Sequence, residues 1–198
     1  MGANLLTDKC AGTDLSGFTI NGTLSGSSGV TMDTANCTID GTGSVTNTGT
    51  ITLTGDKTVA AAANISFGAA AATNPLTVTS GTVTNKGIVS ILSTGTGSGL
   101  TGAGGWTQDS GSTLNTAGAT TTAISITTLD AHTNTNTVDY NGVTQTCKAT
   151  TYVNLKLDGT TSTDSCAPTD VTGTMTIGGG ISWSVPAAGW TESGGLTL

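Results

Sequence analysis

The chain has 198 residues, a formal net charge of −7 and a charged fraction of 9%, well below the roughly 25% that is usual for globular proteins. All five basic residues are lysines, so the chain lacks the basic surface with which a nucleic-acid-binding protein neutralises phosphates. No run approaches the roughly 18 consecutive apolar residues of a transmembrane helix, so we expect no membrane span.

Short runs that alternate one apolar residue with Thr, Ser, Asn or Lys follow one another along the whole chain. This period of two places the apolar side chains on one face of a half-buried strand. The runs are Phe18–Leu24, Val45–Leu53, Leu76–Thr79, Ile88–Leu92, Ile124–Ile126, Thr137–Tyr140, Tyr152–Leu157 and Thr174–Ile177. Gly, Asn and Asp separate them, in pairs such as Asp40-Gly41, Gly55-Asp56 and Asp158-Gly159, which are typical of tight turns.

The alanine-rich stretch Ala60–Ala72 is the one ambiguous segment. A short helix is the alternative, because alanine is the best helix former. We predict strands whose inward residues are small. No segment of ten or more residues shows a helical period.

Many short strands with few aromatic residues favour a β-solenoid. Phe, Tyr and Trp make up only 4% of the chain, too little to fill the thick core of a β-sandwich. In a solenoid each coil stacks on the next, and Thr, Asn, Val and Ile form ladders of like residues. We predict an all-β solenoid, with a β-sandwich that exchanges strands between subunits as the alternative. One elongated domain, 1–198, is expected, divided at most into sub-regions 1–103 and 104–198.

The predicted core is a stack of Val, Ile, Leu and Ala side chains. Ile126 and Leu155 are expected to point inward, so that a charge at either position would prevent folding. Trp106 and Trp190 are each part of a Gly-Trp-Thr triplet, and we expect them to seal turns or end faces of the stack.

The four cysteines form two pairs that are local in the sequence. Three connectivities are possible, and we favour Cys10–Cys37 with Cys147–Cys166. Such disulfides imply an oxidising, extracytoplasmic compartment. The absence of a Cys-x-x-Cys unit and the presence of a single histidine, His132, argue against zinc or haem, so we expect no metal or cofactor.

The sequence offers little material for catalysis. Paired carboxylates for glycoside hydrolysis are absent as Asp-Asp or Asp-x-Asp, and no Gly-x-Ser-x-Gly elbow is present. Asp130 and His132 are the one acid and imidazole close together, and a polar turn is the favoured interpretation. We expect no catalytic residue, and therefore no enzyme.

Ice binding is a rival to a structural role, because Thr-x-Thr pairs on a flat solenoid face can order water. Such pairs are Thr50-Ile51-Thr52, Thr77-Val78-Thr79, Thr82-Val83-Thr84 and Thr174-Met175-Thr176. They do not recur at one fixed period, which argues against a regular ice-binding face.

Residues 104–159 carry a resemblance to a family. The Thr-Val-Asp-Tyr-Asn-Gly strand from Thr137, the Gln-Thr turn at Gln145 and the Thr-Tyr-Val-Asn-Leu-Lys-Leu strand from Thr151 resemble repeats of large bacterial surface proteins. The Gly-Trp-Thr triplet at Gly105 and the run from Thr46 to Gly55 are similar to passenger regions of adhesins and autotransporters. The resemblance implies a right-handed β-helix that serves as a bacterial surface scaffold.

We therefore expect a secreted structural subunit of an extracellular filament, pilus-like fibre or surface adhesin. Its ends carry strand-like runs without polar caps, so copies are expected to self-assemble head to tail through Leu5, Leu6, Leu196 and Leu198. The alternative is a carbohydrate- or ice-binding β-solenoid module, with surface carbohydrate as partner.

Overall fold

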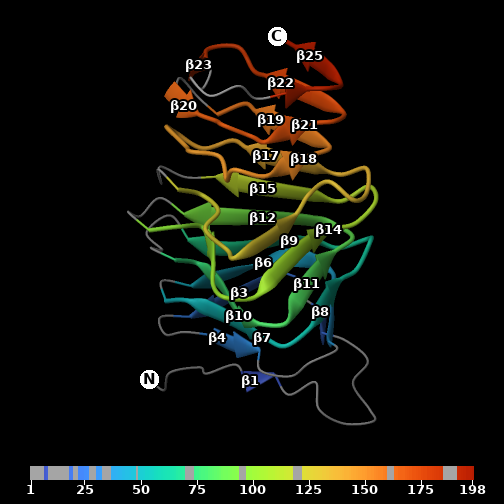
Figure 1. Ribbon diagram of the computed structural model, residues 1–198. Helices are drawn as coiled ribbons and strands as arrows, with labels where there is room; N and C mark the ends of the chain where they lie inside the picture. The colour runs from blue at the N-terminus through green and yellow to red at the C-terminus, as the bar shows by residue number, and fades with distance from the viewer. Residues whose placement is uncertain are drawn as a thin grey trace.

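Stacked β-strands joined by turns and corners form the described chain in the computed structural model (Figure 1). The structure describes residues 7–8, 18–19, 22–26, 30–32, 37–47, 49–69, 74–93, 97–117, 122–159, 163–184 and 191–198. These residues contain no helix, and their strands pair in parallel with equivalent strands of the coils before and after. The predicted all-β solenoid is confirmed.

Three large parallel sheets form the faces of the solenoid. The five-stranded sheet consists of β1 (Thr7–Asp8), β4 (Val30–Met32), β7 (Ile51–Thr54), β10 (Leu76–Ser80) and β13 (Leu100–Thr101). The six-stranded sheet consists of β2 (Phe18–Thr19), β5 (Cys37–Asp40), β8 (Lys57–Val59), β11 (Thr82–Asn85), β14 (Gly105–Gln108) and β16 (Thr128–Asp130). The nine-stranded sheet consists of β3 (Gly22–Gly26), β6 (Thr42–Asn47), β9 (Asn64–Ala69), β12 (Ile88–Ser93), β15 (Thr113–Ala117), β17 (Thr137–Tyr140), β19 (Asn154–Leu157), β22 (Thr174–Ile177) and β25 (Gly195–Thr197).

Two smaller sheets belong to the C-terminal coils. A three-stranded sheet contains β18 (Thr151–Tyr152), β21 (Asp170–Val171) and β24 (Thr191–Glu192), and a two-stranded sheet contains β20 (Thr163–Ser165) and β23 (Ser182–Ser184). An isolated bridge from Ala131 to Tyr152 connects the three-stranded sheet to the end of the six-stranded one. The nine-stranded sheet crosses position 103/104, so the two predicted sub-regions share one sheet.

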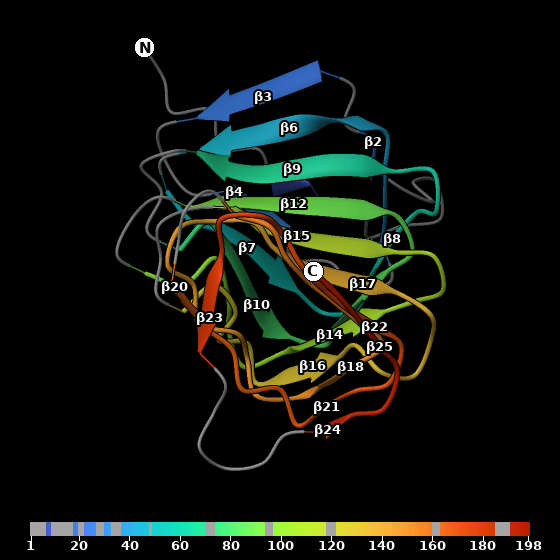
Figure 2. The ribbon, with the colours of Figure 1, turned by 90° about the horizontal axis from the view of Figure 1, so that it is seen from above.

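The coils wind in the right-handed sense. In Figure 2, which looks down the stack from the C-terminal end, β9 runs leftward across the upper part of the view, β10 runs back through the lower part, and the chain then returns to β12. The path is anticlockwise while it advances toward the viewer. Right-handed crossovers are the rule for parallel strands, because a right-twisted strand packs back onto its sheet only in this way.

The length of a coil varies, but the register of the strands is kept. Ser90 and Asn115 are paired in register and are 25 residues apart, whereas the paired residues Asp139 and Lys156 are 17 apart. The corners between strands take up the difference in length. Side chains of different coils are therefore aligned although the sequence has no fixed period.

Three of the predicted strands are divided by corners. Phe18–Leu24 contains parts of β2 and β3, Val45–Leu53 parts of β6 and β7, and Tyr152–Leu157 is divided between β18 and β19. In each case the two strands belong to different sheets. Ile124–Ile126 is not a strand, although Ile124 forms one bridge with Leu100 and both isoleucines are buried.

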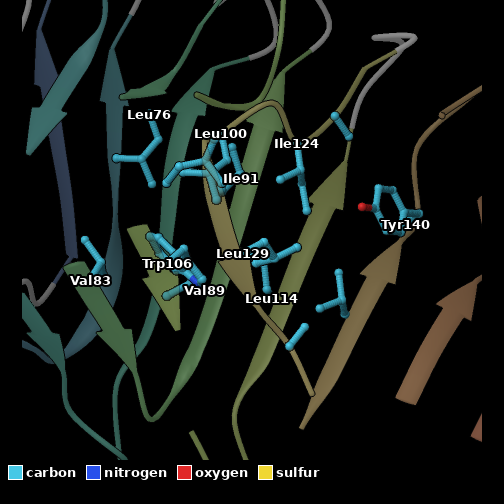
Figure 3. Packing of buried hydrophobic residues seen from close by; sticks show 14 of the residues in the cluster. Leu76, Val83, Val89, Ile91, Leu100, Trp106, Leu114, Ile124, Leu129 and Tyr140 are labelled. Carbon is cyan, nitrogen blue, oxygen red and sulfur yellow. The ribbon is translucent and has the colours of Figure 1, made fainter. Parts of the chain in front are cut away.

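Apolar side chains at alternate strand positions fill most of the solenoid interior (Figure 3). Ile126 and Leu155 are fully buried, as predicted. Within Ala60–Ala72 the predicted strand is confirmed by β9, but its inward residues are not small: they are Ile65 and Phe67, both fully buried. Residues 70–73 lie outside the described part.

Trp106 does not seal a turn or an end face, which corrects the prediction. It is 0% exposed within β14, where the parallel partners of its strand cover both sides. Its indole Nε1 donates a hydrogen bond to Gln108 Oε1 at 2.8 Å, and Asn85 Nδ2 donates to the same oxygen at 2.9 Å. The buried polar atoms thus satisfy one another. Trp190 lies outside the described residues.

Three further side chains that carry polar groups are buried in the interior. Tyr140 and Tyr152 contact each other edge to face, and their hydroxyl oxygens are 3.0 Å apart. The Tyr152 hydroxyl donates to the Lys148 carbonyl oxygen at 2.6 Å, while the Lys148 amide donates to the Tyr140 hydroxyl at 3.0 Å. Lys57 points inward from β8, and its ammonium donates to the Thr54 carbonyl oxygen at the corner between β7 and β8 (2.5 Å).

Two predicted turns need glycine for different reasons. Gly55 has a φ of 74°, a conformation that glycine adopts without strain. Gly159 lies so close to the preceding coil that a Cβ atom would be 1.8 Å from the Gly142 carbonyl oxygen. The first turn is fixed by backbone conformation and the second by the contact between coils.

Candidate functional site

The predicted disulfide Cys147–Cys166 is present. The Cα atoms are 4.7 Å apart, within the ordinary range for a disulfide, and both cysteines are buried. Trp183 packs beside it and donates from Nε1 to the Cys166 carbonyl oxygen at 3.2 Å. Cys37 is buried and is not a free thiol, while Cys10 lies outside the described residues, so their pairing stays a prediction.

At β25, the last described strand of the nine-stranded sheet, a residue of a core column is partly exposed. Leu114, Val138, Leu155 and Met175 form one inward column, each paired in register with the next, and Leu196 of β25 continues it. The first four are fully buried, whereas Leu196 is 49% exposed. Leu196 occupies a core position that no described strand covers on its outer side.

The other three predicted assembly residues, Leu5, Leu6 and Leu198, do not belong to a core column among the described residues. Leu198 follows β25 and is 89% exposed. Leu5 and Leu6 lie outside the described residues.

Threonines from successive coils are aligned on two faces. On the six-stranded sheet, Thr38, Thr58, Thr84 and Thr107 form one column in register, and all four are partly exposed. Parallel strands are roughly 4.8 Å apart, so the hydroxyl groups repeat at that spacing along the axis. The sequence analysis could not detect this alignment, because the number of residues per coil varies.

The five-stranded sheet has a similar column, in which Thr52, Thr77 and Thr101 are partly exposed. Its backbone register continues to Thr31 and Thr7. Neither sheet carries a second complete column of threonines beside the first. On the six-stranded sheet, for example, a column that begins at Thr82 is interrupted, because the residue paired with Thr82 in the next strand is Gly105. The described threonines therefore form single files and not a two-dimensional array.

Asp130 and His132 form a local turn. Asp130 Oδ1 accepts hydrogen bonds from the backbone amides of His132 (3.2 Å) and Thr133 (3.1 Å), and the Thr133 hydroxyl donates to both carboxylate oxygens. These hydrogen bonds hold the pKa of Asp130 below its ordinary value, although partial burial opposes them. The geometry is that of an aspartate that stabilises a turn.

A cluster of charged and amide side chains was missed by the sequence analysis. Asp139 and Lys156 are paired in register across β17 and β19, with Lys156 Nζ 3.4 Å from Asp139 Oδ2. Lys156 Nζ also contacts Asp158 Oδ2. Asn141 and Asp158 follow Tyr140 and Leu157, the last paired residues of these strands. We call Asp139, Asn141, Lys156 and Asp158 the acid–amide cluster.

The acid–amide cluster is partly withdrawn from solvent. The Asp139 side chain is only 9% exposed, and burial, reinforced by the neighbouring Asp158 carboxylate, raises the pKa of Asp139 despite the Lys156 ammonium. The pKa of Lys156 is raised, chiefly by its hydrogen bond to Asp158. A search for Asp-x-Asp motifs could not find Asp139 and Asp158, because these two aspartates belong to different coils. The detectable signal was the alternation in Thr137–Tyr140 and Tyr152–Leu157, which puts Asp139 and Lys156 on outward faces.

Within the described residues, no three or more His, Cys, Asp and Glu side chains form a group suited to a metal ion. The same residues contain no helix of the length and apolarity required to cross a membrane. Comparisons with protein-family models, with curated proteins and with solved structures found no match to the chain.

Proposed function

We propose that the chain is a structural β-solenoid subunit of an extracellular filament or surface adhesin, in which copies stack head to tail. The observation that carries the proposal is the half-exposed Leu196, a residue in register with a fully buried core column. The outer edge of β25 has no strand partner among the described residues, and an unpaired edge favours strand addition. The proposal assigns no catalytic role to the chain.

A second copy fits this end of the stack. β1 and β25 lie at opposite ends of the stack (Figure 1). The nine-stranded sheet, which has β25 as its last strand, is parallel, so a copy shifted along the axis continues this sheet with the same strand direction. Such a contact joins two different surfaces and propagates without closing, so it produces a fibre. The resemblance to bacterial surface-protein repeats and the disulfide Cys147–Cys166 support an extracellular location.

The test compares two lysine substitutions on β25. Leu196→Lys places a charge in the proposed contact, whereas Thr197→Lys places the same charge on the opposite face of the same strand. We expect the wild type and Thr197→Lys to form fibres, seen by light scattering and negative-stain electron microscopy, and Leu196→Lys to remain monomeric. Since Leu196 is already half exposed, circular dichroism should show a folded monomer.

Two results would contradict head-to-tail stacking. One is a wild type that stays monomeric at every concentration tested. The other is a Leu196→Lys variant that forms fibres as readily as Thr197→Lys.

The threonine columns favour a second candidate, a module that binds ice or a crystalline carbohydrate surface. Partly exposed hydroxyl groups at a regular spacing on a flat sheet suit an ordered surface of water or sugar hydroxyls. Thr84→Tyr would interrupt the column on the six-stranded sheet, and Ser90→Tyr on the nine-stranded sheet is its control. If this function holds, the wild type and Ser90→Tyr inhibit ice recrystallisation or bind insoluble polysaccharide, and Thr84→Tyr does not. The single-file arrangement makes this candidate weaker than assembly.

A further inference from the structure

The turn after β17 contains the dipeptide Asn141-Gly142, a sequence that is prone to lose its side-chain amide. Asparagine is a thermolabile residue, and a following glycine has no Cβ atom to hinder the reaction. The Gly142 nitrogen loses its proton and forms a bond to Asn141 Cγ, ammonia leaves, and a cyclic succinimide remains. Water then opens the ring at either carbonyl. The product is aspartate or, where the main chain passes through the side-chain carboxyl group, isoaspartate.

The attacking nitrogen of this reaction is engaged by Gln145. The Gly142 N–H donates a hydrogen bond to Gln145 Oε1 at 2.9 Å. Gly142 is buried and Gln145 is only 2% exposed, so water has little access to compete for this donor. Attack on Asn141 requires the nitrogen to give up this proton and to turn toward Cγ. The reaction therefore has to break the hydrogen bond, which adds to its barrier.

The backbone around the dipeptide is also held in place. The Asn141 amide donates to the Thr116 carbonyl oxygen of the preceding coil at 3.1 Å. On the other side, a Cβ atom at Gly159 of the next coil would be only 1.8 Å from the Gly142 carbonyl oxygen. Closure of the succinimide ring requires the peptide group between Asn141 and Gly142 to rotate, and both contacts oppose that rotation.

The surroundings of the Asn141 side chain give the reaction no assistance. As the new bond forms, negative charge develops on Oδ1, and donors aimed at such an oxygen are what accelerate acyl transfer. Asn141 Oδ1 is buried and has no hydrogen-bond partner.

The turn that returns Gln145 to Gly142 contains a strained residue. Thr144 has a φ of 55°, in the left-handed region that residues other than glycine rarely adopt. Strain that persists in a native structure often marks a functional constraint. Here the strained turn brings the Gln145 acceptor to the nitrogen that would attack.

We propose that Asn141-Gly142 is a latent deamidation site and that Gln145 is the positioning residue that keeps it closed. Opening of the site would damage the fold, because isoaspartate adds a methylene group to the main chain. This extra length would fall where Gly142 packs against Gly159, at the ends of the paired strands β17 and β19. The inference does not depend on head-to-tail assembly.

The experiment incubates the folded full chain at mildly alkaline pH and follows deamidation at Asn141 by peptide mapping with mass spectrometry. The same chain unfolded in concentrated urea gives the unprotected rate. We expect the folded wild type to react at least about tenfold more slowly than the unfolded chain, and Gln145→Met to react about tenfold faster than the folded wild type, since one hydrogen bond is lost. Methionine keeps the approximate size of glutamine and removes the acceptor. Gln145→Glu retains an acceptor oxygen and should keep the reaction slow.

Gln108→Met is the matched control. Gln108 is also fully buried, but its side-chain oxygen accepts from Trp106 and Asn85 and not from Gly142. This variant should lower the stability of the fold and leave the rate at Asn141 unchanged. The Asn21-Gly22 dipeptide of the same molecules is an internal reference, whose rate Gln145→Met should not alter. Circular dichroism before incubation confirms that each variant is folded.

Two results would overturn the proposal. The first is a folded wild type in which Asn141 reacts as fast as in urea, a comparison that requires no variant to fold. The second is an equal rate at Asn141 in Gln145→Met and Gln108→Met, because a general loosening of the fold would then explain any acceleration.

Discussion

Tyr140 and Tyr152 are the two tyrosines of the chain, so the ionisation of this buried pair can be followed without interference. Burial raises the pKa of Tyr140 to about 12, although its hydrogen bonds with Tyr152 and Lys148 oppose the shift. Burial also raises the pKa of Tyr152, and the neighbouring Tyr140 adds to the effect. Both shifts stabilise the neutral hydroxyl in the folded state.

The raised pKa values predict a loss of stability at alkaline pH. An unfolded tyrosine ionises near pH 10. Below that pH the contribution of the pair to stability is fully present, and it is lost as the pH rises toward 12, because the unfolded state releases its protons first. We expect tyrosinate absorbance and the loss of the circular-dichroism signal to rise together above pH 10. Tyrosinate formation with a midpoint near 10 in a protein that remains folded would show that the pair is accessible.

At the scale of single residues, the sequence predicted which side chains point inward but not which polar ones meet. Alternation placed Ile126 and Leu155 in the core correctly. It also put Asp139 and Lys156 on outward faces, but their contact depends on a coil of 17 residues where another coil has 25. No local pattern encodes that difference. Trp106 was misplaced because the predicted core consisted of Val, Ile, Leu and Ala side chains only.

At the scale of the element, alternation makes a sharp prediction for two neighbouring residues of the Ile124–Ile126 segment, although this segment is not a strand. Ile126 is fully buried and Ser125 is exposed. Ile126→Asp buries an unpaired charge and should lower the free energy of unfolding by about 4 kcal/mol or more. Ser125→Asp introduces the same side chain into solvent and should change it by less than about 0.5 kcal/mol. Urea denaturation of both variants measures the difference. Equal stability of the two would mean that the inward and outward faces are assigned wrongly.

The same alternation explains why the strand boundaries were predicted less well than the faces. Val45–Leu53 and Tyr152–Leu157 each continue through a corner into another sheet. In Tyr152–Leu157 the buried residues Tyr152 and Leu155 are three positions apart, with Val153 and Asn154 both partly exposed at the corner between them. Because Val153 is itself apolar, the alternation in the sequence runs on through the corner although the burial does not follow it, so the sequence gives no signal of the change of direction. Corners with glycine, such as Gly55, were found because their backbone conformation restricts the residue type.

At the scale of the whole molecule, each coil contacts mainly the coils before and after it. The stability of such a solenoid is approximately a sum of coils and their interfaces. A bond between two coils therefore acts locally. The disulfide Cys147–Cys166 spans 19 residues in the C-terminal half. In this half the shorter strands of the three-stranded and two-stranded sheets replace the five-stranded and six-stranded sheets.

Removal of this disulfide should loosen the C-terminal coils before the rest of the stack. By the loop-entropy model a loop of this length contributes about 3 kcal/mol. We expect the double variant Cys147→Ala/Cys166→Ala to lose about that much in urea denaturation. Hydrogen exchange should accelerate first in β18–β23, while β9 and β12 keep their protection. Addition of reductant to the double variant then reports separately on the predicted Cys10–Cys37 bond. Uniform acceleration over all coils would instead mean that the solenoid unfolds as one cooperative unit, and that coil-by-coil reasoning does not apply to it.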